Sequence, residues 1–118
     1  MPGMPGGIRL YRETVLTEAG LSAKLTIYPA TIVQARYSGS YEGAPWLCFP
    51  VHVQRFAEPE WRHWDGDEIE CGQFWRHAQG EGWLIGLGKT PTDAYDDLIG
   101  QVCARLGLDR AVLAGEPA

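Results

Sequence analysis

The most regular pattern of apolar positions lies in the C-terminal third of the chain. Beyond Thr90, apolar residues recur every fourth position, at Ala94, Leu98, Val102 and Leu106. This spacing is typical of an α-helix that buries one face. Thr90 followed by Pro91 is also a favourable helix start, because threonine caps the first turn and proline fits its first position. The pattern predicts a helix over residues 90–106.

Residues 31–37 alternate apolar and polar side chains, as a half-buried strand does. Residues 31–37 (TIVQARY) and 46–53 (WLCFPVHV) flank the turn-rich stretch SGSYEGAP, which favours a hairpin. In the second segment Leu47, Phe49, Val51 and Val53 share one side. A third short strand is expected over residues 82–87, whereas residues 8–29 fit either a strand or a short helix. The expected fold is therefore α+β: a three-stranded antiparallel sheet with one C-terminal helix packed on it.

The length of 118 residues predicts a single domain over residues 1–118 with a core of its own. Residues 1–7 (MPGMPGG) form a Pro/Gly-rich segment that we expect to be a flexible lead-in. They lack the charged and apolar regions of a secretory signal. No apolar run reaches the length of a membrane span.

An insertion over residues 54–81 separates the second and third expected strands. A segment of this length is too long for an idle loop in a compact domain, so it should carry structure or function. Aromatic anchors within a polar rim are typical of protein interfaces. The sequence therefore predicts a partner-binding surface in the insertion; the alternative is that its tryptophans belong to the core. The candidate residues are Trp61, Trp64, Asp65, Asp67, Glu68, Glu70 and Trp75.

Charge and cysteine content narrow the classes of function. The net charge of −5 disfavours non-specific nucleic-acid binding and favours a basic protein partner. The three cysteines, Cys48, Cys71 and Cys103, are odd in number and form no C-x-x-C pair. Reduced thiols in the cytoplasm are therefore expected rather than a disulfide framework.

The stretch Gly88-Lys89-Thr90 matches the end of a phosphate-binding P-loop. The motif G-x-x-x-x-G-K-[ST] requires a glycine at position 83, where this chain has Trp83. Pro91 also removes a backbone N–H from the first helical turn. The helix-start interpretation accounts for these residues better, and no cofactor is expected.

Candidates for catalysis are few. His52, His63, Cys71 and His77 do not have the spacing of a zinc site. Carboxylates crowded into one segment more often form a solvated face than a two-metal site. We therefore expect no catalytic residues and no metal. The alternative is a small metal-dependent enzyme that uses the Asp, Glu and His residues of the insertion.

The motif G-x-G-x-T-x-x-D-A-x-x-x-L, read over residues 86–98, resembles the helix start of the HicB-like antitoxin family. The matching positions there are Gly88, Thr90, Ala94 and Leu98. Further matches are Tyr28, Ala30 and Ile32 in the first strand region and the stretch Trp46-Leu47-Cys48-Phe49-Pro50 in the second. The resemblance covers about residues 28–53 and 83–104.

This resemblance implies a β-β-β-α fold like a cut-down RNase H core. It also implies a non-enzymatic protein that silences a nuclease by direct contact, as an antitoxin or as a phage-encoded inhibitor of the anti-CRISPR type. The insertion departs from the family pattern, and no DNA-binding region is seen after Leu108, which puts operator binding in doubt. The expected partner is a basic protein, with no nucleic acid or membrane, and a homodimer stays open.

Overall fold

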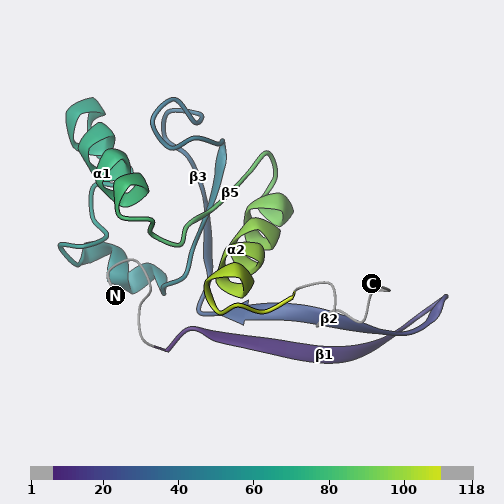
Figure 1. The fold of residues 1–118 in the computed structure, drawn as a ribbon. Helices are drawn as coiled ribbons and strands as arrows, with labels where there is room; N and C mark the ends of the chain where they lie inside the picture. Colours follow the sequence, from purple (N-terminus) through teal and green to yellow (C-terminus); the bar gives the residue numbers. More distant parts are fainter. Residues whose placement is uncertain (1–6, 110–118) are drawn as a thin grey trace.

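The computed structural model describes residues 7–109, apart from the side chain of Ser22, so the expected lead-in at residues 1–7 lies outside it except for Gly7. The chain is α+β, as expected (Figure 1). The elements are β1 (Arg9–Thr17), β2 (Gly20–Tyr28), β3 (Thr31–Gln34), β4 (Trp46–Phe49), the 3₁₀ helix η1 (Val53–Ala57), α1 (Glu68–Gly80), β5 (Gly86–Gly88) and α2 (Pro91–Arg105).

The central sheet has three antiparallel strands in the order β3-β4-β5. Thr31 pairs with Phe49, and Trp46 pairs with Gly88, so β4 lies between its two neighbours. This confirms the expected three-stranded antiparallel sheet. The third strand begins later than expected, at Gly86 rather than at residue 82.

The two faces of this sheet contribute to two separate cores. On one face Cys48 packs with residues of α2, including Ala94, Leu98 and Val102. On the other face Leu47 and Phe49 belong to a second cluster that includes residues of α1. Because side chains alternate along a strand, neighbouring residues of β4 serve opposite cores. Figure 1 shows the resulting three layers, with α1 and α2 on opposite sides of the sheet.

Residues 9–28 form a hairpin of two antiparallel nine-residue strands, which decides between the two alternatives for this region in favour of a strand. The hairpin is a second sheet, β1-β2, and is not hydrogen-bonded to the first. The expected fold of one sheet and one helix is therefore incomplete: the protein has an additional hairpin and an additional helix, α1.

Helix α2 forms for the reasons that the sequence indicates. The Thr90 hydroxyl accepts a hydrogen bond from the N–H of Asp93 at 3.1 Å, and Pro91 occupies the first turn. Ala94, Leu98 and Val102 are buried as expected. Leu106 is not: it lies at the C-terminal cap, and its side chain is 51% exposed. The helical stripe therefore ends one turn earlier than expected, and Ile99 and Cys103 complete it.

The insertion over residues 54–81 is structured. It contains most of η1 and all of α1. Because β4 ends at Phe49 and η1 begins at Val53, the strand alternation does not reach Val53, whose side chain is exposed rather than in line with Leu47.

The glycines that resemble a phosphate-binding loop are packing glycines. A Cβ atom at Gly86 would collide with the Ala94 carbonyl oxygen, and one at Gly88 would collide with the Ala94 nitrogen. The side chain of Asp97 holds the same junction, because its carboxylate accepts a hydrogen bond from the Leu87 N–H at 2.8 Å. The motif therefore lets α2 approach β5 closely. Within residues 7–109, no helix has the length and apolar character needed to cross a membrane.

Candidate functional site

Four acidic side chains gather where the chain enters α1. Asp65, Asp67, Glu68 and Glu70 are all exposed, and we call these four residues the acidic surface. Asp67 is the N-cap of α1, and the two glutamates lie in its first turn. Negative charge stabilises a helix N-terminus, so these residues also favour the start of the helix.

Arg36 lies beside the acidic surface. The Arg36 guanidinium donates to the Asp65 carbonyl oxygen at 2.9 Å and lies 3.6 Å from the Asp67 carboxylate. The ion pair is exposed, with Asp67 85% accessible, so it contributes little to stability. The four carboxylates therefore keep a net negative charge toward solvent.

Ile69 lies between Glu68 and Glu70 on the helix, and its side chain is 76% exposed. It borders a shallow groove between α1 and the turn at residues 40–41, whose other walls include Ser40, Tyr41 and Gly72. The sequence analysis did not single out Ile69. Its position in the run Asp67-Glu68-Ile69-Glu70 is a sequence signal of exposure. A single large apolar residue among charged neighbours at a helix start is expected to face solvent.

The structure corrects the expectation that Trp61 and Trp75 are exposed anchors. Their side chains are 0% and 2% exposed and pack within 6.0 Å of the Phe49 ring, measured between ring centroids. The Trp75 indole N–H donates to the Trp64 carbonyl oxygen at 3.0 Å. These two tryptophans therefore belong to the core, which was the alternative to an interface role.

Trp64 occupies an intermediate position. Its ring is half-buried and lies 5.5 Å from the rings of both Phe49 and Phe56. Because these contacts are internal, Trp64 links the acidic surface to the core beneath it. Its main role is to support the loop that carries Asp65.

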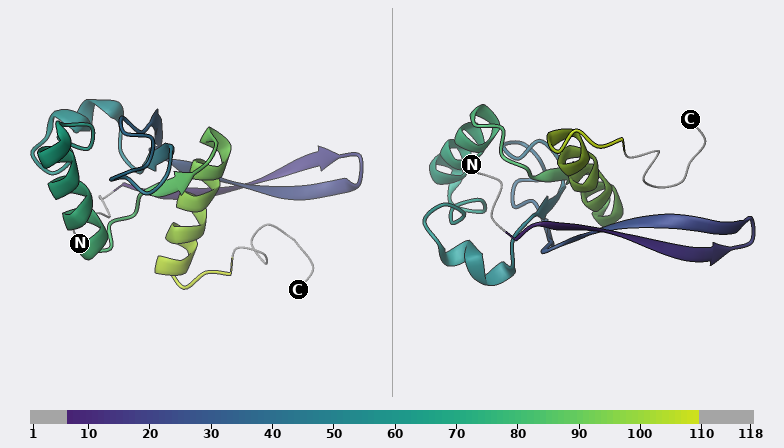
Figure 2. Two further views of the ribbon diagram at one scale, coloured as in Figure 1. Left: turned by 90° about the horizontal axis from the view of Figure 1, so that it is seen from above. Right: turned by 60° about the horizontal axis from the view of Figure 1, so that its bottom comes forward.

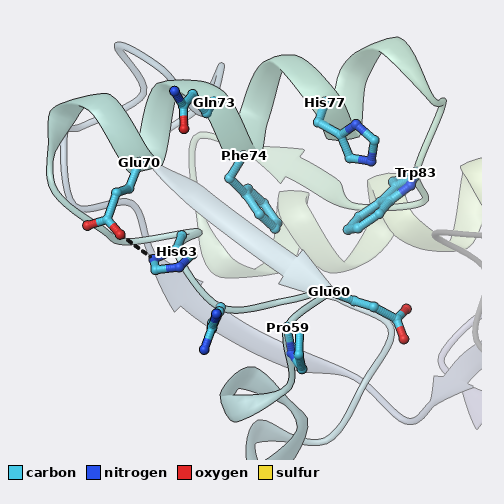
Figure 3. A pocket seen from close by; sticks show the side chains of 9 residues that line it. Pro59, Glu60, His63, Glu70, Gln73, Phe74, His77 and Trp83 are labelled. Atoms are coloured by element: carbon cyan, nitrogen blue, oxygen red, sulfur yellow. Dashed lines mark ion pairs between the residues drawn. The ribbon is translucent and has the colours of Figure 1, made fainter.

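An open cleft of about 780 Å³ lies next to the acidic surface (Figure 3). One wall is a face of α1, where Glu70, Gln73, Phe74 and His77 follow helical spacing. The segment after η1 forms the opposite wall, and Trp83 closes one end. The lining residues are Pro59, Glu60, Arg62, His63, Glu70, Gln73, Phe74, His77 and Trp83. The cleft was missed at the sequence level because α1 itself was not predicted.

His63 and Glu70 form an ion pair at the mouth of this cleft. Nδ1 of His63 lies 2.9 Å from the Glu70 carboxylate. His63 has a φ angle of 77°, which is uncommon for a residue other than glycine and tends to occur at functional sites. When the imidazole is neutral with its proton on Nδ1, that N–H donates to Glu70 and Nε2 accepts a hydrogen bond. The pair can therefore anchor a donor group.

Aromatic rings form the apolar part of the cleft. The imidazole of His77 meets the indole of Trp83 edge-on, with ring centroids 5.5 Å apart, and Phe74 meets the same indole at 5.8 Å. Figure 3 shows His77 and Trp83 together at one end of the cleft and the Glu70–His63 pair at the other, with Phe74 between them. An aromatic wall near carboxylates suits a cationic side chain, which the ring face and the negative charge both attract.

The candidate metal ligands do not meet. His63 pairs with Glu70, whereas the Tyr28 hydroxyl lies 3.1 Å from Nε2 of His52. The Cys71 thiol donates to the Trp64 carbonyl oxygen, and His77 packs on Trp83. Over the part of the chain that the structure describes, no three His, Cys, Asp or Glu side chains form a group that could hold a metal ion.

The three cysteines are free and buried. Burial raises the pKa of the Cys48 thiol to about 12 and that of Cys71 to about 11. A thiol with such a high pKa stays protonated near neutral pH and is a poor nucleophile. Cys48 and Cys103 pack in the α2 core, as expected of structural residues.

Comparison of the chain with known protein families, with curated proteins and with solved structures finds no match.

Proposed function

We propose that this protein is a non-enzymatic binding module that neutralises a basic protein partner by direct contact. The observation that carries the proposal is the acidic surface, in which the exposed Ile69 lies between Glu68 and Glu70 along the helix. A rim of like charge steers a partner of opposite charge, and an apolar centre supplies affinity once water is excluded. The partner surface should therefore carry Lys and Arg around an apolar depression.

The cleft extends this surface toward the partner. Glu70 belongs to both, and the aromatic wall of Phe74, His77 and Trp83 lies on the same helix or next to its end. A Lys or Arg side chain of the partner fits such a site, because it can stack on an aromatic face while it approaches a carboxylate. The expected contact is thus an acidic face with one receptor for a basic side chain.

The resemblance to HicB-like antitoxins supports a nuclease as that partner. Nucleases that act on RNA or DNA present basic surfaces to phosphates, and an acidic protein can occupy such a surface in place of the nucleic acid. The protein would act in the cytoplasm, either as an antitoxin or as a phage-encoded inhibitor of the anti-CRISPR type. No direct binding of nucleic acid or membrane is proposed.

The experiment is capture of the partner with a charge-reversed control. The tagged protein and a variant with Asp65, Asp67 and Glu68 changed to Lys are incubated with lysate of the host cell. A second variant carries the same three reversals at the exposed residues Glu81, Asp93 and Asp96. A nuclease retained by the wild type and the second variant, lost by the first, and inactive in the complex is the expected result.

Two results would reject the proposal. Equal retention of the partner by all three proteins would show that the acidic surface is not the binding site. A retained nuclease that keeps full activity in the complex would show that binding is not inhibitory. Circular dichroism on each variant verifies that the fold is intact before capture.

The alternative is a small metal-dependent enzyme, for which His63, Glu70 and His77 would have to move closer together, because among the described residues they form no group that could hold a metal ion. His63, Glu70 and His77 line the same cleft, and His63 is already paired with a carboxylate, as metal-binding histidines commonly are. Metal analysis of the purified protein tests this alternative. Stoichiometric metal in the wild type that is lost in His77→Ala would support it over the binding module.

A further inference from the structure

The hairpin β1–β2 projects from the body of the molecule as an arm, which we define as residues 9–28. All nine residues of β1 pair with β2, from Arg9 opposite Tyr28 to Thr17 opposite Gly20. Figure 2 shows the arm extending past the two helices in both views, and the molecule measures 50 × 27 × 25 Å. An isolated two-stranded hairpin is only marginally stable in water, so the far half of the arm lacks the support that strands normally have.

The base of the arm is held firmly by α2. Leu25 and Ile27 are buried in the α2 core. The Tyr95 hydroxyl accepts a hydrogen bond from the Ile27 N–H at 2.8 Å and lies 3.2 Å from the Ile27 carbonyl oxygen. The arm therefore leaves the body in a fixed direction.

One face of the arm has an apolar residue in every cross-strand pair, although Arg12 and Thr14 interrupt it on β1. Cross-strand partners point to the same side of a hairpin, and every second pair shares a face. The pairs on the face that meets α2 are Leu10–Ile27, Arg12–Leu25, Thr14–Ala23 and Leu16–Leu21. The last pair lies beyond the reach of the body, with Leu16 81% and Leu21 77% exposed. The apolar strip thus continues past the surface that covers its base.

The outer edge of β1 is also available. Among the described residues β1 pairs only with β2, and the pairing runs through all nine positions without a bulge. Residues 9–28 contain no proline. Bulges, prolines and charged side chains all protect edge strands. This edge has neither of the first two, so another strand can pair with it where that strand matches the charges of Arg9, Arg12 and Glu13.

We propose that two copies of this chain join their arms, β1 to β1, into a continuous four-stranded antiparallel sheet. The two-fold axis passes through Thr14, so that Thr14 of each copy lies opposite Thr14 of the other. This interface goes beyond the proposed function and is independent of it, because it uses neither the acidic surface nor the cleft.

The charges along β1 exclude two registers, and of the remaining ones only an axis at Thr14 sets Leu16 of one copy beside Leu10 of the other. A two-fold axis at Arg12 or at Glu13 would place a like charge directly opposite itself, which destabilises a sheet. The axis at Thr14 pairs residues 11–17 of each strand and sets Arg12 diagonal to Glu18 of the second copy. Diagonal neighbours are within reach of long side chains, so this contact can form twice in the dimer.

The same register covers the exposed tip. Leu16 of one copy becomes the diagonal neighbour of Leu10 in the second copy, on the same face of the sheet. Leu10 is half-buried against the α2 core. The tip of each arm therefore extends the core at the base of the other arm, where apolar surface is already partly covered. An isologous contact of this kind closes after two copies and leads to a dimer rather than a fibre.

A charge-swap experiment tests the proposal by sedimentation equilibrium over a range of protein concentrations. The wild type should be a dimer at micromolar concentration. Arg12→Glu and Glu18→Arg should each raise the dimer dissociation constant by about tenfold or more, because each change disrupts two symmetry-related contacts. The double variant should return to within about threefold of the wild type, since the reversed pair attracts again. Glu81→Arg, an equal change of charge on the body, should have no effect.

Three results would overturn the proposal. The first is a wild type that stays monomeric up to about several hundred micromolar, the upper range for a specific dimer. The second is that the single variants dimerise as tightly as the wild type. The third is that the double variant dimerises no more tightly than the single variants. Circular dichroism of each variant establishes that the arm is still folded. If the captured nuclease, rather than a second copy, responds to the charge swap, the arm binds the partner and the dimer is rejected.

Discussion

At the scale of single residues, burial and close approach account for most of the fold. Glu42 is fully buried, and its carboxylate accepts hydrogen bonds from the N–H groups of Tyr37 and Tyr41 at 3.1 and 3.2 Å. This side chain orders the turn between β3 and β4, since two backbone donors that would otherwise lose water find a partner in it. This turn also positions Tyr37, whose hydroxyl donates a hydrogen bond to the Gly66 carbonyl oxygen below the acidic surface.

Leu98→Ala should lower the free energy of unfolding by about 2–5 kcal/mol, because the Leu98 side chain on α2 is fully buried against β5. Leu106→Ala is the matched control: the side chain is half-exposed at the helix end and should cost less than about 1 kcal/mol. Chemical denaturation measures both. Similar losses in the two variants would mean that the buried face of α2 is misplaced.

Substitutions at Trp64 and Ile69 should affect different properties, stability for Trp64 and partner binding for Ile69. Trp64→Ala should lower the free energy of unfolding by roughly 2–3 kcal/mol, because its ring packs on Phe49 and Phe56. Ile69→Ser should leave stability unchanged and speed dissociation of the partner by about tenfold. Thermal melting and partner kinetics on both proteins give the answer. An unchanged dissociation rate in Ile69→Ser would remove Ile69 from the interface.

The buried Cys48 thiol gives the protein a pH dependence at high pH. Its pKa in the folded protein is about 12, above its ordinary value of 9.0, because burial disfavours the thiolate. The folded state therefore holds a proton that the unfolded state has lost, and stability falls as the pH rises from 9 toward 12. Cys48→Ala removes this contribution. Denaturant titrations at increasing pH should show a smaller loss in the variant; equal slopes would exclude the thiol as the cause.

At the scale of elements, the sequence predicted those whose signals are local. Thr90, Pro91 and the apolar stripe define α2 without tertiary information. Strand β3 showed alternation because one of its faces is the more buried, whereas β4 is apolar at every position because both of its faces are buried. The arm showed no strong alternation of apolar and polar residues, because both sides of its far half face solvent.

Helix α1 escaped prediction for a different reason. Its buried residues Cys71, Trp75 and Ala78 follow helical spacing, but charged neighbours surround Trp75. The tryptophans therefore looked like interface residues, whereas the sheet face formed by Leu47 and Phe49 requires a large apolar cover. Which aromatic residues cover that face depends on contacts between segments far apart in the chain. The acidic residues of the site were found from composition alone; the cleft beside them needed the helix.

The junction between β5 and α2 should respond to small changes in volume. Gly86→Ala should cost at least about 3 kcal/mol or prevent folding, because the added methyl group meets the Ala94 carbonyl oxygen and Leu98. Gly80→Ala, with open space around it, should be tolerated. Lys89→Ala should change neither folding nor partner binding, and calorimetry should detect no ATP binding. Nucleotide binding that depends on Lys89 would contradict the packing role of these glycines.

At the scale of the whole molecule, the acidic surface and the edge of the arm lie in different parts of the structure. The acidic surface lies on the α1 layer, and the arm leaves from the α2 side of the sheet (Figures 1 and 2). A dimer through the arms would leave both acidic surfaces free, so that one dimer could hold two partner molecules. Since α1 is joined to the sheet through the aromatic cluster around Phe49, reversing exposed charges at its N-terminus should lower stability slightly and leave the fold intact.

The most direct test of the central claim is the association rate of the captured partner, measured at increasing salt. For the wild type the rate should fall steeply as ionic strength rises, because the carboxylates steer a basic surface. Changing Asp65, Asp67 and Glu68 to Lys should slow association by about tenfold or more at low salt and flatten its dependence on salt. The same rate and the same salt dependence in a folded triple variant would show that the partner does not dock on the acidic surface.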